Sequence, residues 1–226
     1  MSVLKPIAVA GRSLRAVVFD MDGLMFNTED LYDLVGQAML ERRGHQFDLD
    51  LKLRMMGRTA NAAFEIMRQA CNLSESIDEL KRENDELFMR LLETKLEKLP
   101  GLDNLMHWIA GRFLPLGLAT SSRRFLAEYK LERYQLTTKF RAIVTGDEVR
   151  HGKPDPEIYF LVANRLGVEP TEMLVFEDSV VGSTAAAASG AFTVAVPGKH
   201  GTSQDYSHVN LVVERLDSPT IREMFT

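Results

Sequence analysis

Residues 16–29 read AVVFDMDGLMFNTE, and the interpretation of the whole chain depends on this stretch. The apolar run at 16–19 predicts a strand buried on both faces. Asp20 and Asp22 follow it directly, and residues two apart in an extended segment point the same way. Because an unpaired charge at the end of a buried strand is costly to desolvate, these acids need partners. The stretch therefore predicts two carboxylates sharing one cavity, with Gly23 turning the chain beyond them.

Short apolar runs recur along the rest of the chain, and helical segments separate most of them from about residue 100 onward. Strands that alternate with helices are typical of a parallel α/β sheet, so we expect a Rossmann-like parallel core. Further strands are expected at 116–119, 142–144, 174–176, 192–196 and 211–213, and the clearest helices at 123–134, 156–166 and 180–189.

Residues 29–98 interrupt this alternation, because their apolar side chains recur at helical spacing and no convincing strand lies among them. A Pro-Gly pair at 100–101 marks the return to the α/β pattern. We expect an α/β core formed by residues 1–26 and 99–226, with an inserted α-helical cap at 27–98. The insertion follows the carboxyl end of the first strand, where open parallel sheets bind ligands, so we expect it to act as a lid.

Composition narrows the functional classes. The chain has 226 residues, a net charge of −5 and a pI of about 5.6, which gives no electrostatic footprint for nucleic acid. The single cysteine, Cys71, excludes intramolecular disulfides and zinc sites built on cysteine pairs. No apolar run approaches the length of a membrane span. We expect a cytoplasmic monomer without membrane or nucleic-acid partners, whose residues 1–15 form a loose tail.

Three further strand ends carry polar residues. Thr120 and Ser121 precede a helical segment, where hydroxyls and backbone N–H groups suit a phosphate or simply cap the helix. Lys153 lies in the proline-rich loop GKPDP. It either supplies a fixed positive charge to a site or is an ordinary surface lysine. Glu177 and Asp178 follow an apolar strand. Both are candidate Mg²⁺ ligands, and Asp178 is also a candidate cap for the next helix.

Taken together, these residues indicate the type of site more specifically than any one motif does. The D-x-D-G motif alone also suits a capped turn, but here acids, hydroxyls and one lysine all fall at strand ends. Mg²⁺ and a lysine would keep the carboxylates ionised and neutralise an incoming phosphate. The combination indicates a phosphoryl-transfer site.

At this point the chain resembles a known family. The segments FDMDGLMFNTE, LATSS, HGKPDPEIY and VFEDSVVG are similar to the four ordered motifs of the haloacid dehalogenase-like (HAD) hydrolase superfamily, over about residues 16–197. Within it, the chain resembles the subgroup with a helical cap inserted after the first strand. That subgroup includes β-phosphoglucomutases, pseudouridine 5′-phosphatases and 2-deoxyglucose-6-phosphatases.

The resemblance implies a phosphatase that hydrolyses a small phosphorylated metabolite, a sugar phosphate or a nucleoside or pseudonucleoside 5′-phosphate, with Mg²⁺ as cofactor. Asp20 would be the nucleophile and a metal ligand. Asp22 would protonate the leaving alcohol and then activate water, while its backbone carbonyl touches the metal. The resemblance also assigns phosphoryl binding to Thr120 and Ser121, charge stabilisation to Lys153, and metal ligation to Asp178 with support from Glu177.

Two alternatives stay open. A β-phosphoglucomutase would carry a histidine about ten residues past the second Asp, where this chain has Tyr32. This difference favours a phosphatase over a mutase. A non-catalytic binding or phospho-acceptor module is expected to be shorter or to lack one of the acids or the lysine, and none is missing.

Specificity is expected to lie in the cap. The loop MMGRT resembles the family's cap loop, and Arg58 is the candidate for meeting the polar end of the substrate. Family members usually have Asp where Asn27 stands. We expect Asn27 to cap the first cap helix, because Asn caps about as well as Asp.

Overall fold

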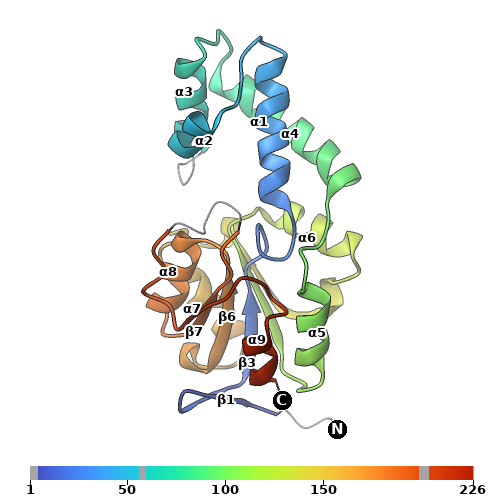
Figure 1. Cartoon of the computed structure of the whole chain (residues 1–226), viewed down its shortest axis with the longest axis vertical. Coiled ribbons are helices and arrows are strands. Elements are labelled where there is room, and N and C mark those ends of the chain that lie inside the picture. Colours follow the sequence, from blue (N-terminus) through green and yellow to red (C-terminus); the bar gives the residue numbers. More distant parts are fainter. Residues whose placement is uncertain (1–4, 56–59, 199–203, 226) are drawn as a thin grey trace. The chain divides into compact units, whose positions relative to one another are not determined.

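The computed structural model describes residues 5–55, 60–198 and 204–225. The chain separates into two compact units (Figure 1). An α/β unit comprises Met1–Phe26 and Lys98–Thr226, and a helical unit comprises Asn27–Glu97. Among the described residues, no helix combines the length and the apolar character needed to cross a membrane.

A six-stranded sheet forms the centre of the α/β unit, with the strand order β5-β4-β3-β6-β7-β8 and parallel pairing throughout. The expected α/β class is therefore confirmed. Phe19 at the end of β3 lies opposite Leu118 of β4 and Phe176 of β6, so these three strands end side by side. The strands are β3 (Ala16–Phe19), β4 (Leu116–Thr120), β5 (Phe140–Thr145), β6 (Met173–Glu177), β7 (Phe192–Ala195) and β8 (Leu211–Val212).

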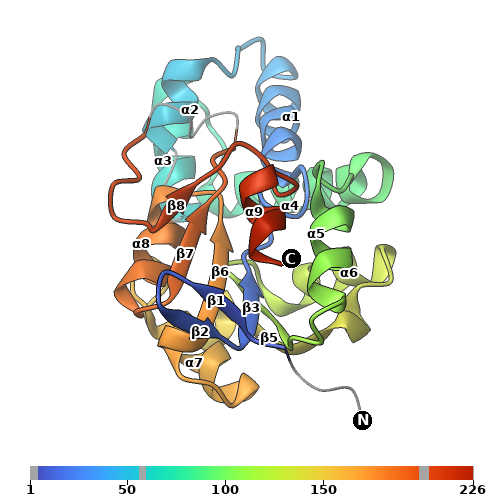
Figure 2. The same cartoon turned by 60° about the horizontal axis from the view of Figure 1, so that its bottom comes forward.

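Helices cover both faces of this sheet. On one face α7 and α8 bury Tyr159, Val162 and Ala185 against alternate residues of the central strands, including Val18 and Val175. Helices α5 and α6 lie on the opposite face (Figures 1 and 2), as right-handed crossovers require. The helices of this unit are α5 (Leu102–Ala110), α6 (Arg124–Arg133), α7 (Glu157–Leu166), α8 (Val180–Ala188) and α9 (Pro219–Met224), with short 3-10 turns at Thr137–Lys139, Gly146–Glu148 and Pro170–Glu172.

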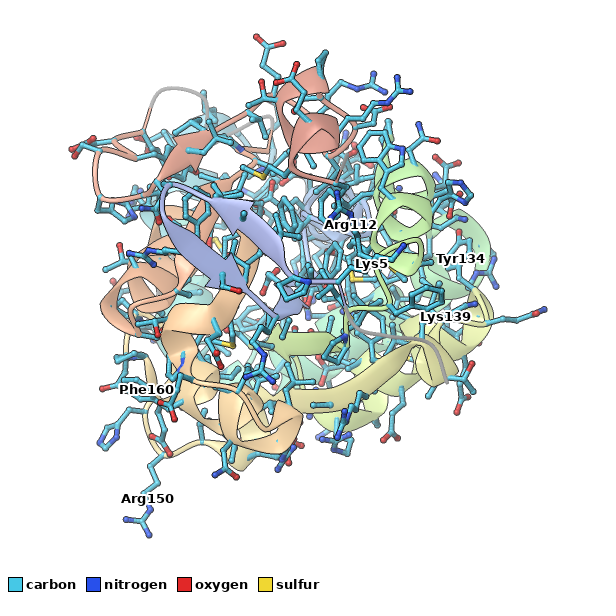
Figure 3. All side chains as sticks on the ribbon, turned by 90° about the horizontal axis from the view of Figure 1, so that it is seen from below. Lys5, Arg112, Tyr134, Lys139, Arg150 and Phe160 are labelled. Carbon is cyan, nitrogen blue, oxygen red and sulfur yellow. The ribbon has the colours of Figure 1, made fainter. Side chains whose placement is uncertain are left out.

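The expectation of a loose N-terminal tail is wrong for the described residues from Lys5 onward. Strands β1 (Ile7–Val9) and β2 (Arg12–Leu14) form an antiparallel hairpin, visible in Figure 2. Its two-residue turn has positive φ at both positions, 48° at Ala10 and 76° at Gly11, as a tight hairpin turn requires. The Lys5 N–H also donates to the Arg112 carbonyl at 2.9 Å, and Figure 3 labels both residues.

In the described part of the helical unit, four helices pack their apolar stripes on one another. Helices α1 and α4 bury Val35, Met39 and Leu92. A capping box fixes the start of α4, since Ser76 accepts the Glu79 N–H and the Glu79 carboxylate accepts the Ser76 N–H. The helices are α1 (Thr28–Glu41), α2 (Leu49–Met55), α3 (Ala60–Ala70) and α4 (Ile77–Lys95).

Asn27 does not act as the expected cap. It occupies the N-cap position of α1, but its side chain makes no capping hydrogen bond. Instead its Oδ1 accepts the Glu97 N–H at 2.9 Å, and its Nδ2 donates to the Lys95 carbonyl at 3.1 Å. The amide therefore bonds the entering chain to the departing chain of the helical unit, and it uses a donor that Asp lacks.

We therefore expect Asn27→Asp to lower the free energy of unfolding by about 1 kcal/mol, because a carboxylate would face the Lys95 carbonyl without a proton to donate. Urea denaturation measures this change. Asn61→Asp is the matched control, since the hydrogen bond that the Asn61 side chain makes with the described residues is one that its oxygen accepts from Lys81. A variant at position 27 as stable as the parent protein would contradict the cross-linking role and favour helix capping.

Candidate active site

The site is built around Asp20, the residue that follows β3. Its backbone N–H donates to the Phe176 carbonyl at 3.0 Å, which extends the pairing of β3 with β6 to the point where the carboxylate emerges. The side chain is nearly buried. The Lys153 Nζ lies 2.6 Å from Asp20 Oδ1 and 2.6 Å from Glu177 Oε1. It also donates to the Ala119 carbonyl at 2.9 Å, so one ammonium group connects the ends of β3, β4 and β6.

Glu177 is held as tightly as the lysine. Its carboxylate is fully buried and accepts hydrogen bonds from Lys153 and from the Tyr159 hydroxyl of α7. Gly182 in α8 leaves the necessary space, because a Cβ at that position would lie 2.0 Å from Glu177 Oε2. Tyr159 and Gly182 were not expected from the sequence as parts of the site. They contact Glu177 only because α7 and α8 pack on the sheet, and the sequence does not show that packing.

The charges of this cluster perturb one another. Burial raises the pKa of Asp20 to about 7, the neighbouring acids add to the rise, and Lys153 opposes it. Burial alone would lower the pKa of Lys153, but Asp20 and Glu177 raise it well above its ordinary value. Burial and the charge of Glu177 also raise the pKa of Tyr159. Lys153 therefore stays a cation, and one positive charge offsets the two carboxylates only in part.

Three carboxylates could hold a metal ion at this edge of the sheet. Asp20, Glu177 and Asp178 each offer an oxygen, and these oxygens lie within 4.8 Å of one another. All three residues are buried. An all-oxygen set of this kind suits a hard divalent cation, which would supply the missing positive charge. Asp178 does not cap α8, because Ser179 occupies that position and accepts the Gly182 N–H.

Asp22 lies beside a different group of side chains. Its Oδ2 accepts hydrogen bonds from the hydroxyls of Thr120 at 3.2 Å and Ser122 at 2.7 Å. Its Oδ1 accepts one from the Nζ of Lys130, a fully buried residue of α6. Thr120 Oγ1 in turn accepts the Ser122 N–H at 3.1 Å, so the end of β4 folds around the Asp22 carboxylate.

The predicted site residues that the structure describes lie at or next to the ends of β3, β4 and β6, or in the loop that carries Lys153. Ser121 is exposed, and Ser122 rather than Ser121 bonds to Asp22. Arg58 lies outside the described residues. Sequence reasoning missed Lys130, although a signal exists: Leu126, Ala127 and Leu131 flank it at helical spacing, which places position 130 on the buried face of α6.

Comparison with known proteins identifies relatives of the chain. The family model described as "Haloacid dehalogenase-like hydrolase" matches residues 17–196. A Thermotoga maritima protein named "Phosphorylated carbohydrates phosphatase" is 36% identical over 177 residues, covering 78% of this chain and 82% of that protein. A Drosophila melanogaster protein named "Probable pseudouridine-5'-phosphatase" is 34% identical over 220 residues, covering 92% of this chain and 94% of that protein.

A solved structure is also similar. The crystal structure described as "putative beta-phosphoglucomutase from Thermotoga maritima" aligns with a TM-score of 0.78 and 32% sequence identity. The alignment covers 90% of this chain and 95% of that one. The alignment therefore includes residues of both the α/β unit and the helical unit.

We expect Gly182→Ala to destabilise the chain by about 1–3 kcal/mol, because the added methyl group overlaps the buried Glu177 carboxylate and forces it to shift. Thermal or chemical denaturation measures the loss. Gly111→Ala is the matched control, since a Cβ there meets its nearest atom, the Trp108 carbonyl oxygen, only at 3.4 Å. Equal stability of the two variants would show that Glu177 does not occupy the space beside α8.

Proposed function

The chain belongs to the haloacid dehalogenase-like hydrolase family, and on that premise we propose that it is a Mg²⁺-dependent phosphatase of small phosphorylated metabolites. The proposed substrates are sugar phosphates and nucleoside or pseudonucleoside 5′-phosphates, and the proposed intermediate is an aspartyl phosphate. The names of the two phosphatase relatives support the reaction class. The expectation of a monomer in the cytoplasm, without nucleic-acid or membrane partners, is part of this proposal.

The buried Lys153 between Asp20 and Glu177 is the observation that carries the proposal. A nucleophilic carboxylate must be ionised, fixed in place and shielded from water. Burial shields Asp20 from water, while Lys153 holds its Oδ1 and favours its charged form. Mg²⁺, held by Asp20, Asp178 and the Asp22 carbonyl with Glu177 as a direct or indirect support, would supply positive charge for the oxygens of the transferring group.

In the first step an Asp20 oxygen attacks phosphorus, and the bond from phosphorus to the ester oxygen breaks. Asp22 gives its proton to that leaving oxygen, which departs as an alcohol. In the second step Asp22 takes a proton from water, whose oxygen attacks phosphorus. The bond between Asp20 and phosphorus then breaks, and inorganic phosphate leaves with Asp20 regenerated.

Binding of the transferring group is proposed for the end of β4. The Thr120 hydroxyl already contacts the Asp22 carboxylate, and the adjacent backbone at Ser121 leads toward the start of α6. Hydroxyl and N–H donors there suit phosphoryl oxygens. Because the phosphoryl group supplies most of the recognition, we expect several small phosphomonoesters to be accepted.

A mutase is the second candidate, suggested by the name of the similar crystal structure. A mutase returns the phosphoryl group to another hydroxyl of the same sugar rather than to water. The sequence has Tyr32 where the mutase pattern expects histidine. Within the helical unit the Tyr32 ring stacks on Phe88, with centroids 4.2 Å apart, and this supports a packing role over proton transfer.

The decisive assay is hydrolysis of p-nitrophenyl phosphate by the purified full chain. We expect turnover with Mg²⁺, its loss with a chelator, and a fall on the order of 10³-fold or more in kcat for Asp20→Asn, because the amide cannot act as the nucleophile. Asp50→Asn makes the same change at an exposed position and should retain activity. Turnover that survives Asp20→Asn would refute the mechanism.

A further inference from the structure

Lys130 is an unusual residue for the inner face of a helix. Its side chain is fully buried, with Leu126, Ala127 and Leu131 as the other buried residues of α6. Lysine is almost never fully buried unless it is paired, because removing its charge from water is costly. An aliphatic side chain at position 130 would extend the apolar face of α6 without that cost.

The ammonium group is paired with Asp22. Its Nζ donates to Asp22 Oδ1 and, at 3.1 Å, to the Ser122 hydroxyl. That hydroxyl donates onward to Asp22 Oδ2 at 2.7 Å. One cation and one hydroxyl therefore hold both oxygens of the carboxylate, and the Thr120 hydroxyl adds a third donor. Rotation of the Asp22 side chain would break all three contacts.

Stability does not explain this arrangement. The Asp22 side chain is 27% exposed, so water could solvate it without a buried partner. Replacing a buried ion pair by apolar side chains is often neutral or stabilising. The fold therefore does not require a lysine at this position, and what the lysine provides is a fixed orientation of one carboxylate. That carboxylate is the one to which the proposed function assigns proton transfer.

We propose that Lys130 is a positioning residue: it fixes the orientation of the Asp22 side chain, which in its protonated form transfers a proton to the leaving oxygen and becomes the carboxylate that the lysine binds. The proposal rests on the proposed function. It also has a consequence for substrate range: Lys130 should matter most for esters whose leaving oxygen is strongly basic, such as the alkoxides of sugars and nucleosides. Esters with acidic leaving groups need less help from Asp22.

The test uses two aryl esters of similar size, p-nitrophenyl phosphate and phenyl phosphate, at saturating Mg²⁺. Phenol is the weaker acid, so its departure depends more on a positioned proton donor. The quantity compared is kcat/KM, which reports only the steps through transfer of the phosphoryl group to the enzyme. Lys130→Met keeps the length of the side chain and removes its charge.

For Lys130→Met we expect kcat/KM to fall at least about ten times more with phenyl phosphate than with p-nitrophenyl phosphate, since general acid catalysis contributes roughly 10²–10⁴-fold. The loss should lie in kcat rather than in KM. In an Asp22→Asn background, Lys130→Met should cause little further loss, because the two residues act as one unit. The proposal would be overturned if Lys130→Met lowered kcat/KM equally for the two esters. It would also be overturned if Lys130→Met lowered kcat/KM as much in the Asp22→Asn background as in the parent protein.

Lys139→Met is the matched control, an exposed lysine of the same unit, labelled in Figure 3, whose change should leave both rates unaltered. If Lys130→Met does not fold, Ser122→Ala replaces it, since this variant removes one donor to Asp22 and leaves the charge pair. It should shift the ratio between the two esters in the same direction, and an unchanged ratio would overturn the proposal. Failure of the proposed function is separate: the parent protein would then lack Mg²⁺-dependent turnover that requires Asp20.

Discussion

The rest of the site depends on one ammonium group, the Nζ of Lys153, placed between the carboxylates of Asp20 and Glu177. Two buried carboxylates repel each other, and burial disfavours the charge on each of them. The raised pKa of Asp20 reflects that cost, and the lysine offsets part of it. Tyr159 and the missing side chain at Gly182 complete the arrangement by fixing Glu177. A nucleophile, a cation and candidate metal ligands are thereby held at the ends of adjacent strands.

Much of this was predictable because parallel strands bring their carboxyl ends together. Asp20, Thr120 and Glu177 each end or follow an apolar run, so the sequence alone placed them at one edge of a sheet. The strand runs could be recognised because they are buried on both faces and almost uniformly apolar. The ordered motifs then identified the family, which the family model and the relatives confirm.

Other features could not be predicted because they depend on tertiary contacts. Residues 7–14 alternate too briefly to stand out from a disordered tail, yet Ile7 and Leu14 are buried in a hairpin. Asn27 is of a residue type that often caps helices, but its side-chain amide instead bonds to the backbone of Lys95 and Glu97. Lys130 breaks an apolar pattern, and only the folded chain reveals Asp22 as the reason.

Rapid acid quenching during turnover of p-nitrophenyl phosphate with Mg²⁺ shows whether Asp20 accepts the phosphoryl group. Asp22→Asn should favour accumulation of the intermediate, because water activation is then slow while the departing nitrophenolate needs little protonation. Borohydride reduces an acyl phosphate to an alcohol, which mass spectrometry of the peptides can locate. We expect reduction at Asp20 alone. Reduction at another residue, or none while substrate is being consumed, would contradict this expectation.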